Sequence, residues 1–224
     1  MGRKRKGALS EVATSEVTTD LYSLVAQVGN AKRNPFSLIV ADPPWFYTGW
    51  KGKHQGAASA AYSLMKTGDI IRLPVGALAA PDCALVLWGT WPKLNDAISV
   101  MEGWGFRYVT ALFVWNKTYE KGTAYCGLGS YTRSGTEFCL LGLRGRMPRH
   151  STNVKQVITS PVTKHSRKPE EIFSELDLLW PASKHPHRLE LFSREPREGW
   201  VTWGNQVKDE QAADFSPIGD TPAP

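Results

Sequence analysis

The segment Asp42-Pro43-Pro44-Trp45 has the most unusual chemistry in this sequence. Its two successive prolines remove backbone donors and fix an extended bend, so that backbone carbonyls stay available as acceptors. The bend carries a carboxylate on one side and a large indole on the other. An acceptor-rich pocket beside an aromatic face suits a flat ring that bears an exocyclic amine, and adenine is such a ring.

The chemistry that this segment predicts is methyl transfer to the N6 amine of adenine. That amine is a poor nucleophile, because its lone pair is delocalised into the purine ring. The Asp42 carboxylate and the Pro43 carbonyl can each accept one amine hydrogen, which favours a pyramidal nitrogen with a free lone pair. A preorganised carboxylate also stabilises the positive charge that develops during attack, and in-line alignment with a methyl donor supplies proximity. The alternative is a tight turn with a packed tryptophan.

The elements around this bend alternate between short apolar runs and helical patterns. Strands are expected at 37–41, 84–88, 108–115, 138–143, 154–159 and 188–192, and helices at 21–28, 92–103 and 169–179. Continuous apolar strands separated by helices predict an α/β fold, with a mostly parallel sheet covered on both faces. In such sheets ligands bind outside the carboxyl ends of the strands, and Asp42 directly follows the first strand.

The composition fits one domain between two polar ends. We expect a basic, flexible arm over 1–34, the main domain over 35–207 and a disordered tail over 208–224. The net charge of +6 suits a polyanionic partner, although many soluble proteins share it.

The cysteines, the apolar runs and the histidines limit the expected location of the protein and the kinds of site that it can contain. The three cysteines show no CxxC spacing and the start lacks an apolar signal region, so a cytoplasmic location with reduced thiols is expected. No apolar run is long enough to span a membrane. The five histidines show no metal-ligand spacing, so no metal is expected.

Four motifs in order resemble one known family. They are Val40–Trp45, Tyr62-Ser-Leu-Met65, the run His165-Ser-Arg-Lys168-Pro169-Glu-Glu-Ile172, and Glu190-Leu-Phe-Ser-Arg194 followed by Trp200-Val-Thr-Trp-Gly204-Asn205-Gln206. Together they resemble the MT-A70 family of DPPW-type adenine-N6 methyltransferases. That family includes the eukaryotic mRNA adenosine methyltransferase and many bacterial and phage DNA adenine methyltransferases. The resemblance runs from about 36 to 206.

The fold that this resemblance implies is a Rossmann-like S-adenosylmethionine-dependent methyltransferase fold in the permuted, β-class order. The catalytic strand comes first, and the strand that binds the cofactor comes near the C-terminus. This order accounts for the absence of a GxGxxG segment after the first strand. The chain departs from the family at Ser193, where glycine or alanine is commoner; serine is still small enough for close approach of a ligand.

The resemblance also implies a cofactor, S-adenosyl-L-methionine, and the residues that hold it. Asp42 would touch both the target amine and the methionine end of the cofactor, and Lys168 would bind the cofactor carboxylate at the start of a helix. The expected cofactor-binding residues are Asp42, His165, Lys168, Glu190, Phe192, Arg194, Asn205 and Gln206. A mutual ion pair is the alternative role for Glu190 and Arg194. The acidic residue that reads the cofactor adenine upstream of the bend is not recognisable here.

Two loops that follow strand ends, 46–61 and 116–133, interleave aromatic and basic residues. Such interleaving suits an extruded base and its phosphates. The expected substrate-binding residues are Trp50, Lys51, Lys53, Tyr62, Lys117, Tyr131 and Arg133, beside the catalytic group Asp42, Pro43, Pro44 and Trp45. The alternative is two ordinary mobile loops with solvated lysines.

Three functions compete on the sequence alone. An active adenine-N6 methyltransferase is favoured over a non-catalytic nucleic-acid-binding subunit, because Asp42, Lys168 and Asn205 are all kept. An amide N-methyltransferase is disfavoured, since related amide sites use Asn-Pro-Pro-Tyr. DNA is favoured over RNA, because the compact chain resembles the stand-alone bacterial and phage enzymes. The recognition sequence stays open, as does the oligomeric state, for which a homodimer is an alternative.

Overall fold

The computed structural model describes residues 21–26, 36–47, 64–129, 131–163 and 167–204. Its seven-stranded sheet has the order β5-β3-β4-β2-β1-β6-β7. The strands are β1 (Phe36–Ala41), β2 (Ala79–Gly89), β3 (Arg107–Thr118), β4 (Thr136–Arg144), β5 (Val157–Pro161), β6 (Arg188–Leu191) and β7 (Val201–Trp203). Among these strands only β4 is antiparallel to its neighbours, β2 and β3. The predicted mostly parallel α/β sheet is therefore confirmed.

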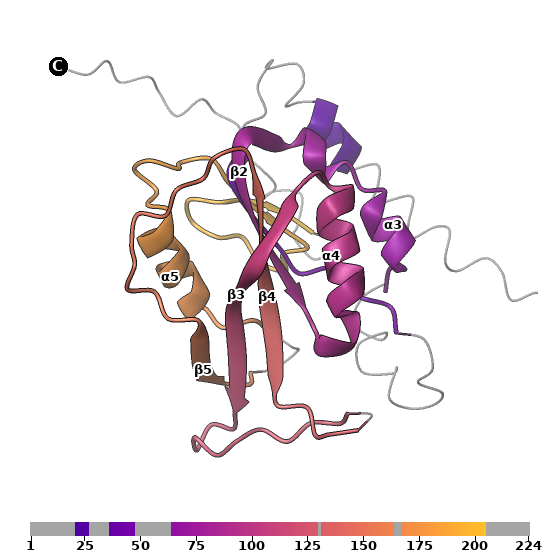
Figure 1. Cartoon of the computed structure of the whole chain (residues 1–224), viewed down its shortest axis with the longest axis vertical. Helices are drawn as coiled ribbons and strands as arrows, with labels where there is room; N and C mark the ends of the chain where they lie inside the picture. The colour runs from indigo at the N-terminus through magenta and orange to yellow at the C-terminus, as the bar shows by residue number, and fades with distance from the viewer. Residues whose placement is uncertain (1–20, 27–35, 48–63, 130, 164–166, 205–224) are drawn as a thin grey trace, which may run out of the picture.

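Helices cover both faces of the sheet. Figure 1 shows α3 (Thr67–Ile71) and α4 (Leu94–Gly103) on one face and α5 (Glu171–Leu179) on the other. Short 3-10 turns, η1 (Val75–Ala77) and η2 (Trp91–Lys93), flank β2, and residues 21–26 form a further helical segment. Pro92 lies in the first turn of η2, where its missing N–H has no cost, and the chain continues into α4. No helix within the described ranges is long and apolar enough to cross a membrane.

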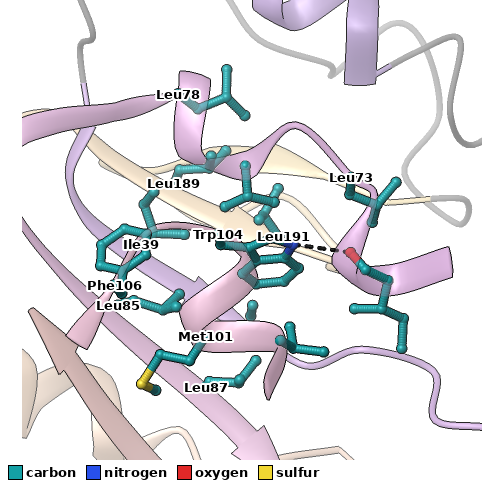
Figure 2. Close-up of a cluster of buried hydrophobic side chains, with 14 of the residues drawn as sticks. Ile39, Leu73, Leu78, Leu85, Leu87, Met101, Trp104, Phe106, Leu189 and Leu191 are labelled. Atoms are coloured by element: carbon teal, nitrogen blue, oxygen red, sulfur yellow. Dashed lines mark hydrogen bonds between the residues drawn. The ribbon is translucent and has the colours of Figure 1, made fainter. Parts of the chain in front are cut away.

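Two apolar cores lie on the two sides of the sheet, because successive side chains of each strand point to opposite faces. On the α4 side, Ile39, Leu85 and Leu189 pack around Trp104 (Figure 2), whose indole N–H donates to the Ile70 carbonyl at 2.9 Å. On the α5 side, a second cluster joins Trp88 of β2 to the buried stripe of α5. The central strands are thus buried on both faces, as their continuous apolar runs predict.

The structure also contains elements that the sequence patterns do not predict. The strand β7 and the helix α3 fall where no periodicity is visible, and β5 starts at Val157 rather than 154. The helix expected over 21–28 is described only for 21–26. The expected arm and tail lie outside the described residues, apart from that helix. The buried cysteines Cys83 and Cys139 lie in β2 and β4.

The direction of β4 decides what gathers at the carboxyl edge of the sheet. Because β4 is antiparallel, its first residues, Thr136 and Glu137, lie beside the carboxyl ends of β2 and β3. The connection between β3 and β4 protrudes from this edge, at the bottom of Figure 1. Asp42 follows the carboxyl end of β1, on the other side of β2. Asp42, Thr136 and Glu137 therefore lie at the same edge of the sheet.

Candidate active site

The Asp42–Trp45 bend is held by backbone hydrogen bonds. The Trp45 N–H donates to the Pro43 carbonyl at 2.9 Å, which closes a tight turn. Met65 clamps the bend from the side: its N–H donates to the Pro44 carbonyl at 2.8 Å, and its carbonyl accepts the Phe46 N–H at 2.9 Å. A carbonyl has two lone pairs, so the Pro43 oxygen keeps one for a ligand. The bend is thus rigid and still offers an acceptor.

Trp45 lies in the core rather than beside the pocket. Only 5% of its surface is exposed, and its indole N–H donates to the Trp88 carbonyl at 3.1 Å. The sequence predicts that this indole forms an aromatic face of the pocket, and the structure differs because the ring turns into the apolar cluster on the α4 side. Trp45 therefore anchors the bend that carries Asp42.

Four charged side chains form a chain of ion pairs at this edge, which we call the charge cluster: Asp42, Lys168, Glu137 and Lys117. The Lys168 ammonium lies 2.8 Å from the Asp42 carboxylate and 3.3 Å from that of Glu137. Lys117 lies 2.5 Å from Glu137 on its other side. The exposed fractions are 31% for the Asp42 side chain, 16% for Lys168, 12% for Glu137 and 15% for Lys117. Asp42 is thus the member of the cluster most open to a ligand.

The ion pairs keep the buried members of this cluster charged. Burial alone would lower the pKa of Lys168, but the carboxylates of Asp42 and Glu137 raise it above its ordinary value. Burial alone would raise the pKa of Glu137, but the ammonium groups of Lys168 and Lys117 lower it. An ammonium has three donors, and the two carboxylates use two of those of Lys168. The third can hold the carboxylate of a ligand beside Asp42.

Lys117 has a different environment from the phosphate-facing one that the sequence predicts. Its ammonium is paired with Glu137 and lies 4.8 Å from the centroid of the Trp115 ring and 5.8 Å from that of Tyr125. Its charge is therefore neutralised inside the molecule. Glu137 itself is absent from the expected site residues, because sequence patterns show only that it precedes an apolar strand. The antiparallel direction of that strand, which brings it to the site, is a tertiary feature.

The carboxyl end of β6 carries the predicted cofactor residue Glu190. Arg197 donates to Glu190 at 2.8 Å and to Glu170 at 2.6 Å, so Glu190 is paired with Arg197. Burial raises the pKa of the Glu190 carboxyl; Arg197 opposes this shift, and the charges of Glu170 and Asp42 add to it. Arg197 is not predicted from the sequence, because it lies in a loop without a motif.

The turn after β6 has an uncommon backbone. Phe192 has a φ of 63°, a left-handed conformation that bulky residues rarely adopt, and its ring packs edge-on against Trp203 at 5.4 Å. The Ser193 N–H donates to the Trp203 carbonyl at 3.0 Å. A Cβ at Gly204 would lie 2.0 Å from the Ser193 oxygen, so only glycine allows this approach. Strain of this kind is typical of ligand-binding turns.

These groups fit S-adenosyl-L-methionine chemically. The methionine end of that cofactor is a zwitterion, which the Asp42 carboxylate and the spare donor of Lys168 complement. Glu190 lies one strand away on β6, where a carboxylate can accept hydrogen bonds from ribose hydroxyls. Phe192 and Arg194 lie in the adjoining turn. We therefore take the carboxyl ends of β1 and β6 as the candidate cofactor site.

The remaining expected residues divide into two groups. Tyr131 and Arg133 are exposed on the connection between β3 and β4, as a role in substrate binding requires. The others lie outside the described residues, namely Trp50, Lys51, Lys53, Tyr62, His165, Asn205 and Gln206. Of the predicted residues, the structure therefore brings Asp42 and Lys168 into direct contact, with Glu190 on the neighbouring strand.

Comparison with known proteins gives similar sequences over most of the chain. A Type II methyltransferase, M.MunI of Mycoplasma sp., is 33% identical over 195 residues, covering 79% of this chain and 80% of its own length. The human N(6)-adenine-specific methyltransferase METTL4 is 29% identical over 82% of this chain. The N6-methyladenosine RNA methyltransferase MTA1 of Cryphonectria parasitica is 30% identical over 80% of it. This chain matches only 40% of METTL4 and 54% of MTA1.

The match to a family model covers the same region as the site. The MT-A70 model matches residues 36–206, a span that starts with β1 and ends just after β7. It includes the Asp42 bend, the charge cluster and the turn after β6. The fold, the arrangement of the site and these similarities agree, and the chain belongs to the MT-A70 family.

Proposed function

We propose that this protein transfers a methyl group from S-adenosyl-L-methionine to the N6 amine of adenine in DNA. The observation that carries the proposal is Asp42: a partly exposed carboxylate at the end of a buried strand, on a rigid Pro-Pro bend, in contact with a buried ammonium. Membership of the MT-A70 family supports the chemistry. So do the names of METTL4 and MTA1, which both refer to N6 of adenine or adenosine.

The residues of the site have separate tasks in this reaction. The cofactor supplies an electrophilic methyl group on a sulfonium sulfur. The Asp42 carboxylate and the free lone pair of the Pro43 carbonyl accept the two amine hydrogens of adenine, which frees the nitrogen lone pair for attack. Asp42 also stabilises the positive charge that develops on that nitrogen, and its carboxylate or water takes the proton that the nitrogen then releases. Lys168 fixes the orientation of the Asp42 carboxylate.

DNA is the favoured polymer. The chain matches the Type II methyltransferase over most of both lengths, whereas it spans about half of the relative named as an RNA methyltransferase. RNA adenosine is the alternative substrate, and MTA1 supports it. A non-catalytic nucleic-acid-binding subunit is less favoured, since Asp42, Lys168 and Glu190 are all in place.

The test of this proposal is methyl transfer from labelled S-adenosylmethionine to two polymers, DNA free of adenine methylation and an RNA of mixed sequence. Digestion to nucleosides then identifies the product. We expect N6-methyldeoxyadenosine from DNA and little label in RNA. Label only in N6-methyladenosine would reverse the choice of polymer. Label in neither polymer, with cofactor still bound, would favour the non-catalytic subunit.

Cofactor binding gives a prediction for Lys168 and Asn205. We expect Lys168→Gln and Asn205→Ala each to weaken binding of S-adenosylhomocysteine by roughly tenfold or more, because each removes a hydrogen bond to a polar or charged group of the cofactor. Calorimetry measures this change. Tyr108→Ala, at the opposite edge of the sheet, is the control and should keep the wild-type affinity. Unchanged affinity in both site variants would show that these residues do not bind the cofactor.

Salt dependence gives a prediction for the basic start of the chain. If Arg3, Lys4, Arg5 and Lys6 neutralise phosphates, the log–log slope of duplex DNA affinity against salt falls by about 0.9 for each contact. These four contacts together contribute roughly −3.6 to the slope. Lys117 is not counted, because it is paired with Glu137. Deleting residues 1–6 should flatten the slope, as measured by fluorescence anisotropy. A slope near zero in the intact protein would mean that its net charge plays no part in binding.

A further inference from the structure

At the carboxyl edge of the sheet lies Trp91, a large aromatic side chain that neither the motifs nor the mechanism uses. Trp91 is 47% exposed, although tryptophan side chains are usually largely buried. It follows the carboxyl end of β2 by two residues and opens η2. Since Trp45 turns into the core, the aromatic face that the target ring requires has to come from another residue. Trp91 is placed to supply it.

The indole of Trp91 is held in one orientation. Its N–H donates to the Thr136 hydroxyl at 2.7 Å, and its ring makes an edge-type contact with the Phe138 ring, with centroids 5.2 Å apart and an interplanar angle of 65°. Gly89 makes room for this arrangement, because a Cβ there would lie 2.7 Å from the Phe138 ring. One edge of the indole is therefore fixed by β4 while the rest faces solvent. An exposed but rigid ring can bind a base with little loss of side-chain entropy.

Trp91 also lies next to the charge cluster. Thr136, which accepts its N–H, directly precedes Glu137, and Glu137 is paired with Lys168, the partner of Asp42. Thr90 on its other side bonds the Tyr47 hydroxyl at 2.6 Å. Tyr47 in turn lies within reach of the charges of Glu137, Lys168 and Asp42. Trp91 is thus attached on both sides to residues that surround Asp42.

We propose that Trp91 is the platform on which the target adenine stacks as its amine reaches Asp42. This inference rests on the proposed function and assigns the stacking role to Trp91, in place of Trp45. A flat indole surface suits a purine, and stacking adds affinity without requiring hydrogen bonds to base edges. It leaves those edges free for the acceptors at Asp42 and Pro43.

The experiment compares Trp91→Ala, Trp91→Phe and Tyr108→Ala in steady-state methyl transfer to DNA free of adenine methylation. We expect Trp91→Ala to lower kcat/KM for DNA by roughly ten- to a hundredfold, the effect of losing one base–aromatic stack. Trp91→Phe keeps an aromatic face and should recover most of the activity. Tyr108→Ala removes an exposed aromatic residue at the amino end of β3, away from the carboxyl edge that holds Asp42, and should leave kcat/KM unchanged.

A merely structural role for Trp91 predicts a different pattern. If the ring served only to pack against Phe138, Trp91→Ala would lower the thermal unfolding temperature and the affinity for S-adenosylhomocysteine along with activity. Loss of the Phe138 contact lowers the unfolding temperature in either case, whereas the proposal expects the affinity for S-adenosylhomocysteine to stay at the wild-type value. It is overturned if Trp91→Ala keeps the wild-type kcat/KM, or if Trp91→Phe is as inactive as Trp91→Ala. A wild-type protein that methylates neither DNA nor RNA would instead refute the proposed function, and the stacking role with it.

Discussion

Asp42→Ala is expected to lower methyl transfer by roughly a thousandfold or more while the protein stays folded. The loss is large because a preorganised charge next to the reacting nitrogen acts in a site that partly excludes water. The fold survives because the Asp42 side chain is 31% exposed and lies beyond the end of β1 rather than in either apolar core. Steady-state transfer of labelled methyl groups measures the loss of activity, and circular dichroism shows whether the protein stays folded.

Two comparison variants sharpen the test of Asp42. Asp42→Asn should retain more activity than Asp42→Ala, because an amide oxygen still accepts one hydrogen bond although it cannot balance positive charge. Asp69→Ala is a matched control, since it removes a carboxylate from the exposed ion pair with Arg72 on the same sheet face as α4. It should leave kcat unchanged. An Asp42→Ala enzyme with near wild-type turnover would refute the mechanism.

Glu137→Gln is expected to have the largest effect on stability, lowering the free energy of unfolding by about 3 kcal/mol. The charge cluster is neutral as it stands, with two carboxylates and two ammonium groups. Removing the charge of Glu137 leaves Lys117 and Lys168, both largely buried, with only one carboxylate between them. An uncompensated buried charge costs more than a well-made buried pair contributes. Urea unfolding measures the difference.

A double variant separates the loss of charge balance from the loss of a contact. Glu137→Gln combined with Lys117→Met restores a neutral cluster, so we expect it to regain much of the lost stability. Asp69→Asn, which breaks a surface pair, should cost less than about 1 kcal/mol. If Glu137→Gln alone unfolds like the wild type, the cluster does not contribute to stability in the way that we infer.

The effect of Glu137→Gln on stability should depend on pH, and the sign of this dependence follows from the pKa of Glu137. The pKa of Glu137 lies below its ordinary value of 4.5 in the folded protein, so its contribution is fully present above that value. The contribution is lost as the pH falls through the folded pKa, because the folded state then takes up the proton. The difference in stability between wild type and Glu137→Gln should therefore shrink on acidification below 4.5. The pKa of Glu190 is raised, so its contribution to stability changes with pH in the opposite direction. That contribution is the same in wild type and in Glu137→Gln, and it therefore cancels in the difference.

Local patterns in the sequence were sufficient to predict most of the strands and helices and the position of Asp42. Apolar runs and helical periodicity predict six of the seven strands and the helices α4 and α5, because burial pattern depends on each segment's own residues. The position of Asp42 at a carboxyl end follows from the same patterns, since Pro43 and Pro44 must end the strand. The short β7 and α3 have too few residues to show a period.

Only the tertiary structure decided which side chains meet Asp42 and which aromatic ring faces the site. Lys168 lies 126 positions from Asp42 in the sequence, and Glu137 reaches both only because β4 runs antiparallel. That direction depends on pairing between strands, which no local pattern encodes. The same holds for the two tryptophans. Trp45 is buried in the core, where its indole N–H donates to the Trp88 carbonyl, whereas Trp91 is exposed and its indole N–H donates to the Thr136 hydroxyl. Sequence periodicity determines what a segment can bury, whereas packing determines what remains at the surface to bind a ligand.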